Sequence, residues 1–411
     1  MQTFLKHAKS ASRIIATLDP KTKNDVLADM ANTLELQSEC IIFENQKDLD
    51  DAKKNNLSSA MVDRLLLNSK RIAEMAKAIR EIASLKEPIG RVLEGWVVPS
   101  GIKIEKVTIP IGVIGIIYES RPNVTSDTAA LCFKSGNACV LKGGKEAFHS
   151  NAIIASLLQE VLEKHNLPKE IISLLPDASR EGVAQLIKMD KYVDLIIPRG
   201  GEALIRFVSE NATVPVVKHD KGVCHTYVDK DANLEKAIEI VLNAKCQRPS
   251  ACNSLETLLV HEAIAKDFLP RMKEALLLTG AQIKGCEKTH ELLNVPLAED
   301  EDYHTEHLCN ALNIKIVENM DEAIVHIAEY GSSHSEAILS ENYTLVERFL
   351  NEVDAACVYA NASTRFTDGG EFGFGAEVGI STNKLHARGP MGINDLTTYK
   401  FKVYGKGQIR E

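Results

Sequence analysis

The sequence predicts an α/β fold with two doubly wound α/β domains and a small β-rich element. The 411 residues exceed what one simple core usually holds, so two or more domains are expected. Two successive series of apolar runs alternate with amphipathic segments of helical length, which is typical of βαβ units and a parallel sheet. Continuous apolar runs such as IGVIGIIY, residues 111–118, are expected of strands buried on both faces.

The first 88 residues predict helices. In SKRIAEMAKAIREIASLKEP, apolar residues recur at helical spacing, with Ser69 as the expected N-cap and Pro88 marking the exit. Residues 91–110, RVLEGWVVPSGIKIEKVTIP, have two β-rich arms around a Pro-Ser-Gly sequence and predict a hairpin.

Two α/β alternations follow the hairpin. The first is expected to contain strands at 111–118, 138–142, 171–175, 193–198 and 214–218, with helices at 125–136, 147–164, 179–187 and from about 201. The second is expected to contain strands at 225–229, 255–260, 314–317, 335–340 and 357–361, separated by helices. The tail TTYKFKVYGKG, residues 397–407, is again β-rich. These patterns predict one domain over 1–225, a second over 226–360, and a return segment with a C-terminal strand over 361–411.

The composition excludes several classes of function. A net charge of −9 gives no support to nucleic-acid binding, which usually needs a basic face. No stretch approaches the roughly 18 apolar residues of a membrane span, and the N-terminus lacks a signal-peptide core, so a cytoplasmic protein is expected. The nine cysteines form no C-x-x-C pair, and the two histidines of His304-Thr305-Glu306-His307 lack helical ligand spacing. No metal site is expected.

Two cysteines lie close together in CQRPSACNSLETLLV, residues 246–260. Small and polar neighbours leave Cys252 accessible on a loop that enters a strand beginning at Leu255, where functional groups are well positioned. A structural cysteine is the common alternative, because free cysteine is often buried. Cys246 ends the helical stretch VLNAKC and is expected to be structural.

Five motifs in one order carry a family resemblance. They are PIGVIGIIYESRPNVT, GNACVLKGGKEA, QRPSACNSLETLLVHE, YGSSHSEAI and GEFGFGAEVGISTNKLHARGPMG. With them the chain resembles the aldehyde dehydrogenase superfamily and, within it, the γ-glutamyl phosphate reductases, over nearly its whole length. The resemblance implies an aldehyde-dehydrogenase-like fold. It also implies NADPH-dependent reduction of L-glutamyl 5-phosphate to L-glutamate 5-semialdehyde and phosphate, a step of proline biosynthesis.

The resemblance assigns the two catalytic residues. Cys252 matches the family nucleophile, whose thiolate attacks the acyl phosphate, expels phosphate and leaves a thioester that accepts hydride. Asn123, in RPNVT, matches the asparagine that stabilises negative charge on the former carbonyl oxygen together with the backbone N–H of the nucleophile. Asn123 after Pro122 also suits a turn residue or an N-cap, and the two roles are compatible.

A missing glutamate distinguishes between the branches of the superfamily. Hydrolytic aldehyde dehydrogenases carry a glutamate in an E-L-G-G motif that activates water. The corresponding stretch here is His219-Asp220-Lys221-Gly222. The absence favours an enzyme that exchanges its thioester with phosphate. Two alternatives remain: a hydrolytic aldehyde dehydrogenase for another semialdehyde, and a catalytically silent scaffold of the same fold.

The resemblance also implies where the cofactor binds. Lys142 matches the lysine that contacts the adenosine ribose, and three positions later Lys145 stands where NAD-preferring relatives have an acidic residue, which suits the 2′-phosphate of NADPH. Gly200 and Gly201 open a helix after a strand and suit a phosphate, or form only a tight turn. Glu306 matches loosely the glutamate near the nicotinamide ribose. Lys145 is alternatively a solvated lysine beside Glu146.

The expected substrate has two anionic ends, and three residues are candidate donors to them. They are Arg121, Ser335 and Arg365, each of which is otherwise a surface or loop residue. The hairpin at 91–110 and the β-rich tail match the family's oligomerisation elements. Because isolated two-stranded ribbons are marginal alone, a homodimer or a dimer of dimers is expected.

Overall fold

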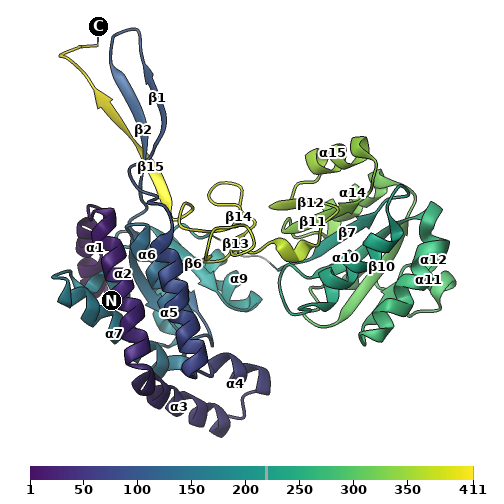
Figure 1. Ribbon diagram of the computed structural model, residues 1–411, viewed down its shortest axis with the longest axis horizontal. Helices are drawn as coiled ribbons and strands as arrows, with labels where there is room; N and C mark the ends of the chain where they lie inside the picture. Colours follow the sequence, from purple (N-terminus) through teal and green to yellow (C-terminus); the bar gives the residue numbers. More distant parts are fainter. Residues whose placement is uncertain (218–220, 411) are drawn as a thin grey trace. The chain divides into compact units, whose positions relative to one another are not determined.

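The computed structural model describes residues 1–217 and 221–410. The chain forms two compact units, the first comprising Met1–Lys218, Gly373–Gly379 and Met391–Glu411, and the second His219–Phe372 and Ile380–Pro390. Each unit contains a parallel sheet with helices on both faces, which confirms the predicted α/β class (Figure 1). Within the described ranges, no helix is both long enough and apolar enough to span a membrane.

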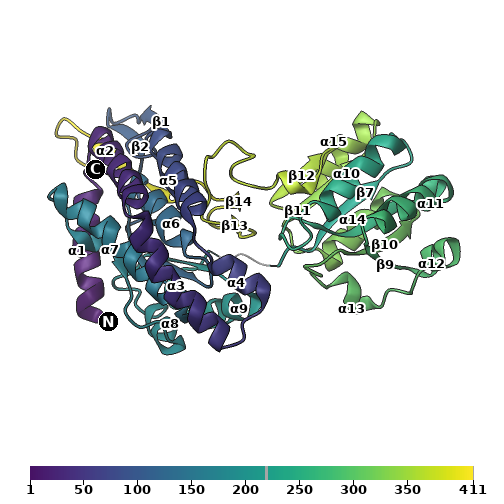
Figure 2. The ribbon, with the colours of Figure 1, turned by 60° about the horizontal axis from the view of Figure 1, so that its bottom comes forward.

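The predicted N-terminal helices are present in the first unit. They are α1 (Gln2–Ile15), α2 (Pro20–Leu36), α3 (Ser38–Lys54), α4 (Ser59–Leu65) and α5 (Ser69–Ser84). Figure 2 shows α2, α3 and α5 beside one another. The N-cap of α5 is Asn68 and not Ser69, because Asn68 is the extended residue whose side-chain oxygen accepts a hydrogen bond from the Arg71 N–H at 2.9 Å.

A four-stranded parallel sheet of order β5-β4-β3-β6 forms the centre of the first unit. Its elements are β3 (Val113–Tyr118), α6 (Asn123–Lys134), β4 (Ala138–Lys142), α7 (Phe148–Lys164), β5 (Ile172–Leu174), α8 (Arg180–Leu186), β6 (Leu195–Arg199) and α9 (Glu202–Asn211). The chain passes from β3 to β4 and β5 on one side and then places β6 on the other. This reversal beside β3 creates a topological switch point, where ligands of open α/β sheets bind at the carboxyl ends of the strands.

Of the strand predicted at 214–218, the described residues show a single parallel bridge between Val216 and Ile196, and Lys218 lies outside the described residues. Pro215 has no N–H to donate to a ladder, although its carbonyl accepts from the Ile196 N–H at 2.8 Å.

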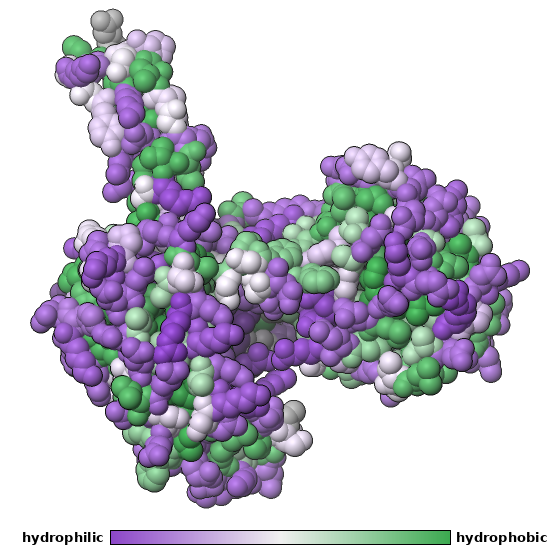
Figure 3. Space-filling model, in the orientation of Figure 1, coloured by the Kyte–Doolittle hydropathy of each residue, from purple (hydrophilic) through white to green (hydrophobic). Residues whose placement is uncertain are grey.

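Three antiparallel strands form an arm on the first unit (Figure 1). The strands are β1 (Val92–Val97), β2 (Lys103–Pro110) and β15 (Thr397–Tyr404), in the order β1-β2-β15. The predicted hairpin is therefore present, and the predicted tail strand pairs with it. Figure 3 shows hydrophobic and hydrophilic residues mixed along the arm. Its exposed large apolar side chains include Val92, Leu93, Trp96, Val97, Tyr399, Phe401 and Val403.

The second unit is built on a six-stranded parallel sheet of order β12-β11-β7-β8-β10-β9. Its strands are β7 (Cys224–Val228), β8 (Leu255–His261), β9 (Gln282–Gly285), β10 (Ala311–Val317), β11 (Ser335–Leu339) and β12 (Cys357–Ala360). Its helices are α10 (Leu234–Cys246), α11 (Glu262–Leu278), α12 (Glu287–Leu293), α13 (Asp300–Tyr303), α14 (Met320–Tyr330) and α15 (Tyr343–Glu352). A small pair, β13 (Ile380–Ser381) and β14 (Gly389–Pro390), completes it.

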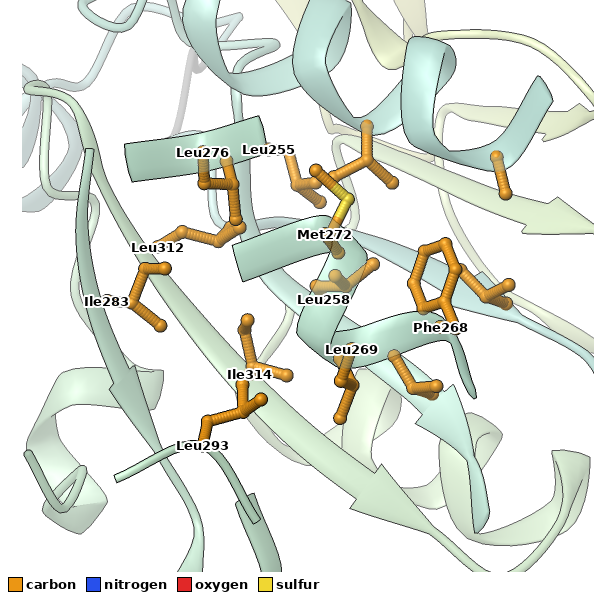
Figure 4. Close-up of a cluster of buried hydrophobic side chains, with 14 of the residues drawn as sticks. Leu255, Leu258, Phe268, Leu269, Met272, Leu276, Ile283, Leu293, Leu312 and Ile314 are labelled. Atoms are coloured by element: carbon orange, nitrogen blue, oxygen red, sulfur yellow. The ribbon is translucent and has the colours of Figure 1, made fainter. Parts of the chain in front are cut away.

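Alternate side chains of β8 enter separate cores on the two faces of this sheet. Leu258 packs with Phe268 and Met272 of α11 (Figure 4), whereas Leu259 packs against α14 and α15 through residues such as Phe349. The edge strand β9 was not predicted, because it is short and only alternate residues are buried. The rigid sheet fixes the loop that precedes β8, where Cys252 lies.

Candidate active site

Cys252 lies on a half-buried turn between α10 and β8. Two successive turns carry it, since the Ala251 N–H donates to the Arg248 carbonyl at 3.1 Å and the Ser254 N–H donates to the Ala251 carbonyl at 2.9 Å. Gly222 passes against this turn so closely that a Cβ there would lie 1.6 Å from the Cys252 carbonyl oxygen. Position 222 therefore cannot carry a side chain. His219 and Asp220 of the same stretch lie outside the described residues.

The segment around Arg365 clamps the Cys252 turn from the other side. The Asn253 Nδ2 group donates to the Thr367 carbonyl at 2.8 Å, and the Thr364 hydroxyl donates to the Asn253 carbonyl at 2.7 Å. The Arg365 guanidinium donates through Nη1 to Asn253 Oδ1 and through Nε to Gln247 Oε1, the latter at 2.8 Å. The structure thus brings predicted residue Arg365 beside Cys252.

Glu306 also reaches this site. Its Oε1 atom accepts a hydrogen bond from the Gly222 N–H at 3.0 Å, next to the place where Gly222 touches Cys252. The predicted cofactor residue and the predicted nucleophile therefore belong to one constellation within the second unit.

Ser335 lies beneath the site and is fully buried. Its hydroxyl lies 2.8 Å from His334 Nδ1 and 2.6 Å from Thr367 Oγ1. His334 in turn lies 3.8 Å from the sulfur of Cys224, which donates to the Cys252 carbonyl at 3.3 Å. Burial raises the pKa of the Cys224 thiol well above its usual range, which keeps it a protonated donor. In this conformation Ser335 supports the Cys252 turn from below and does not face solvent.

A buried ion pair lies directly behind the turn. The Lys245 ammonium contacts Glu256 Oε2 at 2.8 Å, and both side chains are fully buried. Burial raises the pKa of Glu256 to about 8, and the neighbouring charge of Glu306 acts in the same direction, whereas Lys245 opposes the shift. The pair joins the end of α10 to the second residue of β8 and so fixes both ends of the loop that carries Cys252.

Cys246 has the surroundings of a structural residue. It packs against the core beneath α11, and its sulfur lies 3.3 Å from the Thr279 hydroxyl and 3.6 Å from Asn310 Oδ1.

In the first unit, Asn123 is the opening residue of α6, which follows β3 at the switch point. Its Nδ2 group donates to Asp127 Oδ2 at 2.8 Å. Burial raises the pKa of Asp127 to about 6, and the Asn123 hydrogen bond opposes that shift. Asp127, one turn along the helix, therefore orients the Asn123 amide. Arg121 lies exposed just before this helix.

Lys142 ends β4 at the same edge of the sheet. Its ammonium is buried and donates to the Ala178 carbonyl at 2.8 Å, and burial lowers its pKa. Lys145 is exposed in the following turn. The neighbouring Glu146 turns back, and its Oε1 accepts from the Ser120 hydroxyl at 2.8 Å.

Gly200 and Gly201 connect β6 to α9 on the other side of the switch point. The Gly201 N–H donates to Glu119 Oε2 at 3.0 Å, so a carboxylate already accepts one donor at this helix N-terminus. A Cβ on Gly200 would lie 2.7 Å from the same carboxyl group. The switch point, the α9 N-terminus and the Lys142 ammonium together fit a nicotinamide nucleotide, with Glu119 as a competing anion.

Several residues of these constellations escaped the sequence argument. They are Arg248, Gly222, Cys224, His334, Asp127 and Glu119. The sequence drew attention to Gly222 only because its stretch, residues 219–222, lacks the glutamate of the E-L-G-G motif. No local pattern predicts that Gly222 packs on Cys252. The SSHS sequence before β11 was the one available signal for His334, since polar residues at a strand start often belong to a site.

Comparisons with known proteins agree with this geometry. Residues 1–285 match the model of the aldehyde dehydrogenase family. Over their full lengths the chain is 67% identical to a γ-glutamyl phosphate reductase of Aliarcobacter butzleri and 64% identical to one of a Nitratiruptor species. The crystal structure of γ-glutamyl phosphate reductase from Thermotoga maritima superposes with a TM-score of 0.98 at 46% identity, covering 100% of this chain and 99% of that one. The chain therefore belongs to the aldehyde dehydrogenase family and, within it, to the γ-glutamyl phosphate reductases.

Proposed function

We propose that the protein reduces L-glutamyl 5-phosphate to L-glutamate 5-semialdehyde and phosphate, with NADPH as reductant, in proline biosynthesis. The observation that carries the proposal is the Cys252 turn, a half-buried cysteine with Gly222 packed on its carbonyl in the stretch where hydrolytic relatives have their glutamate motif. Membership of the γ-glutamyl phosphate reductases supports it, and a cytoplasmic location is part of the proposal.

The residues divide the work in two stages. Cys252 attacks C5 of the acyl phosphate and forms a thioester as phosphate leaves. Bound NADPH supplies the hydride that reduces this thioester. The Asn123 amide and the Cys252 backbone N–H stabilise the negative charge that develops on the carbonyl oxygen in both stages. The Asn123 amide group has two N–H hydrogens, and one of them is bonded to Asp127. The other is the proposed donor to the carbonyl oxygen of the substrate.

The cofactor and substrate assignments are part of the same proposal. Lys142 and Lys145 bind the adenosine ribose and its 2′-phosphate, Gly200 and Gly201 approach the diphosphate, and Glu306 contacts the nicotinamide ribose. Arg121 binds an anionic end of the substrate, and Ser335 acts through the hydrogen-bonded support of the site.

We further propose that the protein assembles as a homodimer or a dimer of dimers through the arm of β1, β2 and β15. The arm exposes aromatic side chains, and Trp96 of β1 packs edge-to-face on Phe401 of β15 with ring centroids 6.2 Å apart. The register places Trp96, Ile104 and Val403 on one face of the arm, whereas Lys402 pairs with Glu105 on the other face. An apolar face of a ribbon in water gains stability when another surface covers it.

Oxidation of L-glutamate 5-semialdehyde by NADP⁺ is expected to require inorganic phosphate or arsenate. The reason is that the stretch His219-Asp220-Lys221-Gly222 lacks the water-activating glutamate of the E-L-G-G motif, so the thioester is expected to need an anionic acceptor. The measurement is NADPH formation at fixed semialdehyde with and without phosphate, in a buffer of constant ionic strength. Sulfate serves as the control anion, since it binds similar sites without accepting the acyl group. Equal rates in all three buffers would favour the hydrolytic alternative.

Lys145→Glu is expected to raise the KM for NADPH by about 10- to 100-fold and to change that for NADH little. A charged hydrogen bond to the 2′-phosphate is worth about 1.5–3 kcal/mol, and about 1.4 kcal/mol corresponds to a factor of ten. The measurement is kcat/KM for both cofactors with both proteins.

Lys164→Glu provides the matched control for that experiment. Lys164 is equally exposed but ends α7, which begins three residues after Lys145. A helix of 17 residues is about 25 Å long, so the same charge reversal lies far from the cofactor. If Lys145→Glu leaves the NADPH/NADH ratio at the value of the control, Lys145 does not contact the 2′-phosphate.

A further inference from the structure

A second cationic side chain accompanies Arg365 at the Cys252 turn. Arg248 is the first residue of that turn, because its carbonyl accepts the Ala251 N–H, and it directly follows Gln247, which holds Arg365 Nε. Arg248 is exposed, whereas Arg365 is half-buried. The sequence argument singled out Arg365 alone.

The two guanidinium groups lie close enough to repel each other. Burial lowers the pKa of Arg365, the charge of Arg248 lowers it further, and the sulfur of Cys252 and the carboxylate of Asp368 act in the opposite direction. Asp368 is partly committed elsewhere, since its Oδ1 accepts from the Gly370 N–H at 2.8 Å. Arg248 and Arg365 thus place two cations on the Arg365 side of the Cys252 turn, whereas the Glu306 carboxylate lies on its Gly222 side.

Arg365 is held in place for a ligand. Its Nε and Nη1 atoms are fixed by Gln247 and Asn253, and in the described part of the chain its Nη2 atom has no hydrogen-bond acceptor. A guanidinium oriented through two of its nitrogens presents the rest of its fork at little entropic cost, and such forks suit phosphate oxygens.

We propose that Arg248 and Arg365 form the binding site for the phosphoryl group of the substrate, next to Cys252. The inference rests on the proposed function and names the residues that hold its leaving group. The phosphoryl group is bonded through one oxygen to the carbon that the thiolate attacks, so it must lie within a few ångströms of the sulfur. The α-carboxylate is four carbon–carbon bonds away, and the ammonium group would be repelled by the pair.

The same pair serves the chemical step in both directions. In the forward direction the Cys252 sulfur forms a bond to C5. The bond between C5 and the oxygen that bridges to phosphorus breaks, and phosphate leaves with that electron pair. The negative charge of the phosphate faces the two guanidinium groups. In reverse, phosphate bound by the pair attacks the thioester carbon and releases the thiolate. No proton or electron is gained or lost in the exchange.

The test uses the phosphate-dependent oxidation of L-glutamate 5-semialdehyde by the full-length protein. Arg248→Met keeps an unbranched, flexible side chain, shorter than that of arginine, and removes its charge. The variant is expected to raise the KM for phosphate by about 10- to 100-fold, the loss of one charged hydrogen bond, while the KM values for semialdehyde and NADP⁺ change less than about twofold. Arg248→Lys, which keeps the charge without the fork, is expected to fall between the two.

Lys266→Met is the control, because Lys266 is an exposed cation of the same unit. Thr279, which directly follows α11, contacts Cys246 at the end of α10. Lys266 lies 13 residues earlier in α11, about 20 Å along the helix from that contact. Arg248 is preferred to Arg365 for the test, since removing Arg365 would also release Gln247 and Asn253 and disturb the turn.

Three results would overturn the proposal. An increase confined to the semialdehyde KM would show that the pair binds the α-carboxylate. Unchanged constants in Arg248→Met would show that Arg248 holds no substrate anion. If the wild-type rate of semialdehyde oxidation does not depend on phosphate, the proposed function itself is refuted. That experiment is therefore carried out before any variant is made.

Discussion

Cys252→Ala is expected to lower kcat by about 10⁴-fold or more, the order seen when a covalent nucleophile is removed. Without the thiol no thioester forms, and a carbonyl attached to phosphate must then accept hydride with no covalent help. The turn itself should survive, because Ala251 and Ser254 close it through backbone hydrogen bonds and alanine is smaller than cysteine. Fold and nucleotide binding are therefore expected to stay intact.

Cys246→Ala is the matched variant, with the same change six residues earlier. It is expected to keep most activity, since within the described residues Cys246 contacts Thr279, Asn310 and the core beneath α11. Steady-state rates of both variants are compared, along with iodoacetamide labelling mapped by mass spectrometry. Activity lost in Cys246→Ala and kept in Cys252→Ala would reverse the assignment. Slow labelling of Cys252 together with a wild-type protein that shows no turnover would favour the silent scaffold.

Motifs confined to one stretch of chain predicted much of this site. The loop position of Cys252 followed from its small neighbours and from the strand that begins at Leu255, and the structure places it there. The βαβ alternation was equally local, because continuous apolar runs mark strands buried on both faces.

Contacts between segments far apart in the chain could not be predicted from the sequence. Gly201 bonds Glu119, which lies 82 residues earlier, and β15 pairs with β2 nearly 300 residues away. Ser335 illustrates the same limit, because the direction of a side chain at the start of β11 depends on its neighbours β7 and β12. A side chain at position 222 would collide with Cys252, which lies 30 positions later, so the sequence around Gly222 gave no sign of its role.

Lys245→Met is expected to destabilise the second unit by about 3–5 kcal/mol above about pH 8, where Glu256 is ionised beside Lys245, because it leaves that carboxylate buried without its partner. For a unit of this size each kcal/mol shifts the midpoint of unfolding by about 2–4 °C. Lys245→Met/Glu256→Leu removes both charges and should recover most of the loss, since a buried pair is often no more stable than apolar residues of similar volume. Thermal melting of the wild type and of the single and double variants measures both effects.

The pH dependence separates a lost charge partner from lost packing. Burial raises the pKa of Glu256 to about 8 although the charge of Lys245 lowers it, and removing the lysine raises it further. A carboxyl group whose pKa is raised on folding costs nothing below its unfolded value of 4.5, where both states are protonated. Between 4.5 and the folded pKa, the variant must bind a proton to fold and loses about 1.4 kcal/mol per pH unit. The melting midpoint of Lys245→Met should therefore approach that of the double variant near pH 5 and fall progressively below it toward pH 8. A gap between the two variants that is independent of pH would mean that Lys245 stabilises the Cys252 loop by packing and not by its charge.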